Sequence, residues 1–208
     1  MTQVARALGL AADYPAALEL LDSLPTTDPE VALRVELERG RVLNSSGSPG
    51  AARPLFESAF AAATHAGFEH LAIDALHMLA IVAPAPEQEA LNRRALELAA
   101  GASDPRARDW RASLLNNLGW AIFERGDHSE ALGVFEDALA ARIEQGKAGN
   151  IRVARWCVAR TLRALGRFDE ALAIQQSLAA EHAAAGTSDP YVDEELAALT
   201  TGLPPNPE

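Results

Sequence analysis

The chain is 208 residues long, with 49% hydrophobic, 23% charged and only 5% aromatic residues, which is enough apolar material for a folded core. Its formal net charge of −11 argues against nucleic acid as a partner, because a phosphate backbone demands clustered positive charge. One cysteine excludes an intrachain disulfide, no apolar run approaches the roughly 20 residues that span a bilayer, and the N-terminus lacks a signal-peptide pattern. We therefore expect a cytoplasmic protein that binds neither nucleic acid nor membrane.

Helices are the expected secondary structure throughout, because much of the apolar content is alanine while strand-favouring residues are scarce. In chain order, an alanine that follows a turn recurs at Ala17, Ala52, Ala90, Ala131 and Ala171. The successive spacings are 35, 38, 41 and 40 residues, as expected for a fixed unit joined by slightly variable linkers. The sequence therefore predicts a structural repeat.

Each repeat is predicted to fold as a helix A, a tight turn and a helix B. Three glycines, Gly47, Gly126 and Gly166, follow helix A, where a left-handed residue is favoured. In the fourth copy, Asp127 and Glu130 form the capping box that starts helix B. Alanine recurs where helix B crosses helix A, because only a small side chain lets the two helices approach closely.

We predict one domain, residues 1–202, that folds as an all-α, right-handed α-solenoid (superhelix) of about five helix-turn-helix repeats, since one helix pair cannot bury its apolar face alone. Residues 189–201 are expected to form a C-terminal cap helix, and the proline-rich residues 203–208 a flexible tail. The first A helix, at about residues 2–11, is short and caps its end weakly. This weak cap suggests a homodimer through the terminal repeat.

The motif built from Leu118-Gly119 and Ala131 resembles the tetratricopeptide repeat (TPR), whose pattern combines Leu-Gly, an aromatic residue and alanines. The resemblance extends over about residues 2–185, with Leu115 and Ile122 where the family has tryptophan and tyrosine. The Asn-Asn-Leu-Gly stretch and the long spacings are similar to the roughly 42-residue repeats of kinesin light chains. The resemblance implies a curved stack whose A helices line a concave groove used for binding.

Register within this resemblance places polar and aromatic side chains on the concave side of three A helices. They are Asp74 and His77 upstream, Asn116, Trp120, Phe123 and Glu124 on the fourth, and Trp156, Arg160, Arg163 and Arg167 on the fifth. On the fifth helix the arginines and tryptophan share a stripe of about 80°. Two interpretations stay open. In one, the groove binds an acidic or carboxylate-bearing peptide through these arginines and tryptophans, with Asn116 bonding to the peptide backbone. In the other, the arginines pair with Glu124 and with the acidic segment 193–195 of the cap helix.

Little in the sequence indicates a metal site or a catalytic site. His70, Asp74 and His77 share one face of a helix, a spacing compatible with a weak metal site, although a polar groove lining explains it more simply. Cys157 lies on the apolar side of its helix, which favours a small core residue over a nucleophile. No catalytic, phosphate-binding or dinucleotide-binding motif is found, so we expect no cofactor and no enzyme.

The leading hypothesis is a protein- or peptide-binding adaptor that uses the concave groove. The second is a ligand-responsive regulatory sensor module, similar to the helical domains attached to transcription regulators. The third is a metal protein or enzyme centred on His70, Asp74 and His77.

Overall fold

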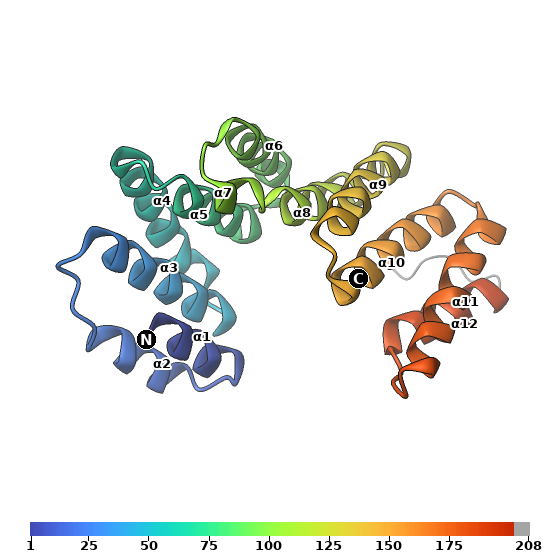
Figure 1. Ribbon diagram of the computed structural model, residues 1–208, viewed down its shortest axis with the longest axis horizontal. Helices are drawn as coiled ribbons and strands as arrows, with labels where there is room; N and C mark the ends of the chain where they lie inside the picture. Colours follow the sequence, from blue (N-terminus) through green and yellow to red (C-terminus); the bar gives the residue numbers. More distant parts are fainter. Residues whose placement is uncertain (202–208) are drawn as a thin grey trace. The chain divides into compact units, whose positions relative to one another are not determined.

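The computed structural model describes residues 1–201 as a succession of helices joined by short turns (Figure 1). These residues form two compact units, the first from Met1 to Leu114 and the second from Leu115 onward. The all-α architecture expected from the sequence is confirmed. The expected flexible tail at residues 203–208 lies outside the described residues.

The first unit is built from α1 to α7 and the start of α8: α1 (Thr2–Leu10), α2 (Tyr14–Asp22), α3 (Pro29–Ser45), α4 (Pro49–Ala66), α5 (Glu69–Val82), α6 (Ala85–Gly101), the single turn α7 (Pro105–Arg108) and α8 (Arg111–Glu124). Helix α3 packs against α4, α4 against α5 and α5 against α6, while α1 packs against both α2 and α3. The odd-numbered helices α1, α3 and α5 are therefore A helices, and α2, α4 and α6 are their B helices.

The second unit continues α8 and adds α9 (His128–Gln145), α10 (Ala148–Ala164), α11 (Phe168–Ala184) and α12 (Pro190–Thr201). Helix α10 packs against α9 and α11, and α12 packs against α11 and α10. Helices α8 and α10 are A helices, α9 and α11 are B helices, and α12 lies where the sequence predicts the cap helix.

The turns between A and B helices have the expected backbone chemistry. Gly47, Gly126 and Gly166 have φ angles of 85°, 92° and 76°, in the left-handed region that favours glycine. The Asp127 side chain accepts a hydrogen bond from the backbone N–H of Glu130 at 3.1 Å, which caps the first turn of α9. Local sequence thus sets where these helices end and begin.

Four of the five predicted anchor alanines are fully buried where helix B meets helix A: Ala17, Ala52, Ala131 and Ala171. The prediction of Ala90 is wrong, because this residue is exposed. Helix α6 begins at Ala85, so Gln88 is its fourth residue and holds the position of the other anchors. The error came from the prolines, since Pro86 lies inside the first turn of α6, where its missing N–H costs nothing.

Neighbouring A and B helices bury their facing sides to form the cores. In the first unit, one apolar cluster includes buried residues of α3, α4, α5 and α6, and a smaller cluster includes residues of α1, α2 and α3. In the second unit, buried side chains include Leu118, Ile122, Phe135, Leu162 and Leu178. None of the helices in residues 1–201 is long and apolar enough to cross a membrane. Helix α1 leaves two apolar side chains exposed, Val4 at 49% and Leu10 at 84%. A homodimer through this terminal repeat stays a prediction.

Gly119 lets α8 approach α9 closely, since a Cβ built on it would lie 2.6 Å from the ring of Phe135. We expect Gly119→Ala to destabilise the second unit by about 1 to 3 kcal/mol, because the buried ring has to move. Gly133→Ala in α9 is the matched control: its Cβ meets nothing within 4 Å, and alanine should stabilise the helix by about 0.5 to 1 kcal/mol. Urea denaturation measures both changes, and effects of the same sign would contradict the close approach.

Candidate functional site

Three aromatic side chains form a row across the A helices of the second unit. Trp120 of α8 lies 6.0 Å from Trp156 of α10, and Trp156 lies 6.0 Å from Tyr191 of α12, measured between ring centroids. The indole N–H of Trp156 also donates a hydrogen bond to the Tyr191 carbonyl oxygen at 3.2 Å. Residues about 35 positions apart meet because successive A helices stack in register.

Further aromatic rings pack against the Trp120 end of the row. The Trp120 ring makes edge contacts with Phe135 and Phe123, with centroids 5.2 and 5.3 Å apart. The Phe123 ring in turn lies 4.5 Å from the ring of His128 at the start of α9. Packing against buried Phe135 helps to fix the position of the Trp120 ring.

These aromatic rings line a pocket of about 700 Å³ in the second unit. Its wall consists of residues from α8, α10 and α12, from the turn before α9 and from the start of α9. They are Trp120, Phe123, Glu124, Gly126, His128, Trp156, Arg160, Tyr191, Glu194 and Glu195. The structure thus brings together five of the side chains that the sequence places on the concave face: Trp120, Phe123, Glu124, Trp156 and Arg160. Tyr191 and His128 were not predicted as part of it.

Arg160 and Arg163 both bind Glu195. The Glu195 Oε1 atom accepts hydrogen bonds from Arg160 Nη1 at 2.8 Å and from Arg163 Nη2 at 2.7 Å, and Oε2 accepts one from Arg163 Nε at 2.7 Å. The side chains of Arg163 and Glu195 are each only 2% exposed, and that of Arg160 is 13% exposed. A buried guanidinium requires such a partner, so the ion-pair interpretation describes these two arginines in this structure.

The remaining residues predicted on the fifth A helix and beside it lie away from the pocket. Arg167 is exposed and binds Glu170 of α11 through two hydrogen bonds of 2.7 Å. The Asn116 side-chain oxygen accepts a hydrogen bond from the Cys157 thiol at 3.5 Å. Burial raises the pKa of Cys157 to about 12, which is consistent with a core residue and not with a reactive thiolate.

Glu124 and Glu194 are the exposed carboxylates of the pocket, one from α8 and the other from α12. Within residues 1–201 neither makes a hydrogen bond or an ion pair with another residue. The sequence named Glu124 and the segment 193–195 as possible partners for the arginines, and within residues 1–201 Glu195 takes that role while Glu124 and Glu194 do not. Glu194 instead adds negative charge to the pocket wall.

The His70, Asp74 and His77 set of the first unit is not a metal centre in this structure. Asp74 binds Arg41 of α3 in an ion pair, and the His77 ring packs against the ring of Trp110 with centroids 5.0 Å apart. His70 lies between Arg34 and Asp104, with its ring nitrogens 3.3 Å from a polar atom of each. No group of three or more possible metal ligands gathers anywhere in the described part of the chain. The metal interpretation is therefore not carried further.

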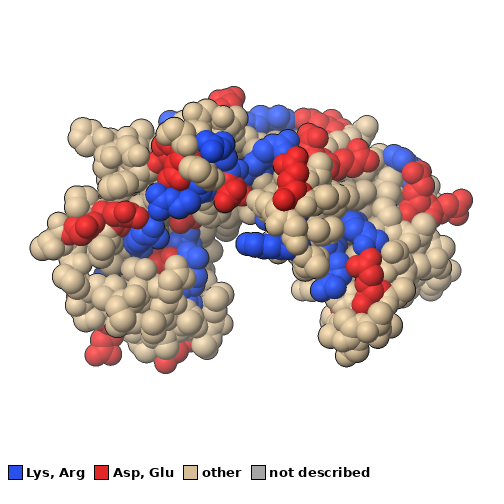
Figure 2. All heavy atoms as spheres, viewed as in Figure 1, with Lys and Arg blue, Asp and Glu red and all other residues tan. Residues whose placement is uncertain are grey.

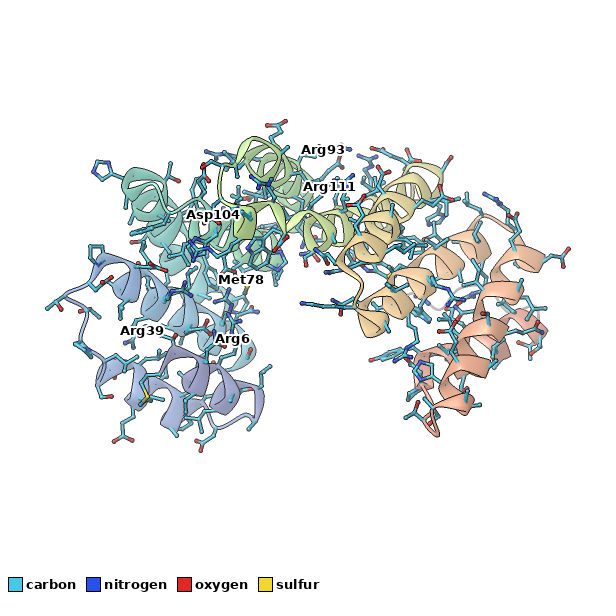
Figure 3. All side chains as sticks on the ribbon, in the orientation of Figure 1. Arg6, Arg39, Met78, Arg93, Asp104 and Arg111 are labelled. Carbon is cyan, nitrogen blue, oxygen red and sulfur yellow. The ribbon has the colours of Figure 1, made fainter. Side chains whose placement is uncertain are left out.

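Asp74 belongs instead to a chain of ion pairs that links three A helices of the first unit. Arg6 of α1, labelled in Figure 3, binds Glu38 of α3 at 2.6 Å. Glu38 also binds Arg41 at 2.9 Å, and Arg41 continues the chain to Asp74 of α5. Figure 2 likewise shows basic and acidic side chains interspersed on the visible face of this unit. The charges of this surface are matched internally.

Residues 111–144, which comprise α8 and most of α9, match the family model of the tetratricopeptide repeat. The fold is similar to the nearly identical TPR-like repeats of a Podosopora anserina protein described as a kinesin light chain, with a TM-score of 0.62 at 19% identity over 97% of this chain and 93% of that one. A variant of the same protein gives a TM-score of 0.68 at 19% identity, with 89% and 94% of the chains covered.

BtubC (BKLC) from P. vanneervenii also has a similar fold, with a TM-score of 0.60 at 21% identity over 94% of this chain and 74% of that one. No curated protein sequence is significantly similar to this chain. The fold and the repeat match define the class of this protein, an all-helical protein built from TPR-like repeats. The resemblance to the TPR family, with repeats of the kinesin light chain type, is thereby confirmed.

Proposed function

We propose that this chain is an adaptor that binds a protein or peptide segment in the aromatic pocket of its second unit, on the concave side expected from the TPR resemblance. The observation that carries the proposal is the row of Trp120, Trp156 and Tyr191 along a pocket of about 700 Å³. Tyr191 is 62% exposed, although a large aromatic side chain usually gains from burial. Aromatic side chains are enriched among the few residues that contribute most of the binding energy at protein interfaces. The proposed role is binding without catalysis.

The charge of the bound segment depends on Glu195. The expectation of an acidic segment rested on Arg160 and Arg163, but both guanidinium groups are bound to Glu195 here. An acidic segment that replaced Glu195 on both arginines would have to displace this buried carboxylate and the part of α12 that carries it. The pocket is therefore proposed as the binding site without the requirement that the arginines contact the ligand.

Selection of random 12-residue peptides on the purified chain, followed by binding measurements with fluorescence polarisation, tests the proposal. Tyr191→Ala is expected to weaken binding of the selected peptides by about tenfold or more, because it removes an exposed aromatic anchor. Phe168→Ala is the matched control, since Phe168 is a 55% exposed aromatic residue of the same unit that does not line the pocket. Failure to select any peptide, or equal losses in the two variants, would refute the proposed site.

A small-molecule sensor is the second candidate function, because the volume of the pocket falls within the range of about 300 to 1,000 Å³ typical of ligand sites. A metabolite library screened by thermal shift separates the two functions. A compound that raises Tm in the unaltered chain but not in Tyr191→Ala would favour the sensor over the adaptor.

A further inference from the structure

The two arginines next to the aromatic row already bind a carboxylate of the protein. Arg160 and Arg163 share Glu195, and the side chains of Arg163 and Glu195 are almost completely buried. Arg155, nearer the start of α10, is directed away from the pocket, because it binds Glu181 of α11. That contact holds the pKa of the Glu181 carboxyl below its usual value, with a smaller contribution from nearby Arg152. An anionic ligand thus meets cations that internal carboxylates already engage.

Two carboxylates of the pocket, unlike its arginine, do not take part in an ion pair among residues 1–201. Glu124 of α8 and Glu194 of α12 both line it, both are exposed, and neither has an ion-pair partner among residues 1–201. A positively charged side chain that enters the pocket would therefore meet two accessible carboxylates without breaking an internal contact. Complementary charge of this kind favours a cationic ligand and speeds its association.

The aromatic row adds a second preference for a cation. The electron-rich faces of Trp and Tyr rings attract ammonium and guanidinium groups within about 6 Å. The pocket contains one such contact already, because Cζ of Arg160 lies 5.6 Å from the centre of the Trp156 ring. Trp120 and Tyr191 lie on either side of Trp156 and offer further aromatic surface next to the exposed carboxylates of Glu124 and Glu194.

We infer that the pocket receives a lysine or arginine side chain, so that the partner is a basic peptide segment. This inference rests on the proposed peptide-binding function and specifies its chemistry. The aromatic rings contact the aliphatic part and the charged head of the side chain, while Glu124 and Glu194 pair with its charge. The net charge of −11 of the whole chain attracts such a segment from a distance.

The experiment compares the composition of 12-residue peptides selected from one random library on three forms of the full-length chain. Peptides selected on the unaltered chain are expected to be enriched in Lys and Arg. The double variant Glu124→Lys, Glu194→Lys reverses the charge of two exposed side chains, and we expect it to lose this enrichment. Its affinity for the basic peptides should fall by about tenfold or more.

The matched control is Asp137→Lys, Glu144→Lys, which changes the net charge by the same amount at two exposed positions of α9 outside the pocket. This control is expected to keep the basic peptides, since it preserves the pocket. Selection of acidic peptides on the unaltered chain overturns the inference while leaving the proposed function intact. Equal loss of basic peptides in both double variants also overturns it, because attraction would then come from the overall charge. If no peptide is selected on any form, the proposed function itself fails.

Discussion

Replacement of Glu195 by alanine is expected to lower the free energy of unfolding of the second unit by about 3 to 5 kcal/mol. The carboxylate of Glu195 accepts three hydrogen bonds from Arg160 and Arg163, and it is the buried counter-charge of both. Its removal leaves the Arg163 guanidinium, with 2% of the side chain exposed, without a carboxylate in a site that water barely reaches. A buried charge without a partner is among the costliest changes that a single mutation makes.

The effect should concentrate at α12, because Glu195 ties this helix to α10. Hydrogen exchange is the measurement of choice, since it resolves the loss of protection in α12 from the behaviour of α9 and the first unit. Urea denaturation gives the size of the global change. Glu194→Ala is the control: this side chain is exposed and unpaired in the described part of the chain, so the change should stay within about 0.5 kcal/mol.

A double replacement separates the pairing from the loss of side-chain volume. Arg163→Met with Glu195→Leu removes the buried pair and keeps apolar atoms in its place, and we expect it to recover more than half of the stability lost in Glu195→Ala. A stability of Glu195→Ala equal to that of the unaltered chain would show that the arginines do not need this carboxylate. It would also reopen the interpretation in which they await an acidic ligand.

Acidification from pH 7 to pH 4 is expected to cost the first unit about 3 kcal/mol through His77. Burial lowers the pKa of His77 from 6.5 to about 4, while nearby Asp74 opposes this change and Arg41 adds to it. Below pH 6.5 the unfolded chain binds a proton at this histidine, whereas the folded chain does so only near pH 4. The contribution of neutral His77 to the free energy of unfolding is therefore fully present above about pH 6.5 and is lost as the pH falls toward 4.

Urea denaturation at a series of pH values measures this dependence. His77→Gln cannot titrate, so its stability should fall less steeply between pH 6.5 and 4, whatever its stability at pH 7. Some slope will remain, because burial also lowers the pKa of His70. His65→Gln serves as the control, since His65 is exposed at the end of α4 and its replacement should leave the slope unchanged. If stability depended on pH equally in His77→Gln and in the unaltered chain, His77 would not be the source of the acid sensitivity.

The repeat architecture could be predicted from the sequence because its determinants are local. A glycine with positive φ favours the end of a helix, and the small residues Ala52, Ala131 and Ala171 permit close helix contacts in their copies. The prediction failed at Ala90 for an equally local reason. A proline such as Pro86 is compatible both with a turn and with the first turn of a helix, and only the packing of α6 distinguishes the two.

The sequence by itself determined the fold class, the helix boundaries at the glycine turns and the group of aromatic and arginine side chains on one face of the A helices. Only the tertiary structure decided which charge of that face remains accessible. Glu194 and Glu195 are neighbours in the chain, yet the stacking of α12 on α10 and α11 buries Glu195 against two arginines and leaves Glu194 in the pocket wall. Adjacent residues on a helix point in directions about 100° apart, so the partner of each carboxylate depends on how the helices pack.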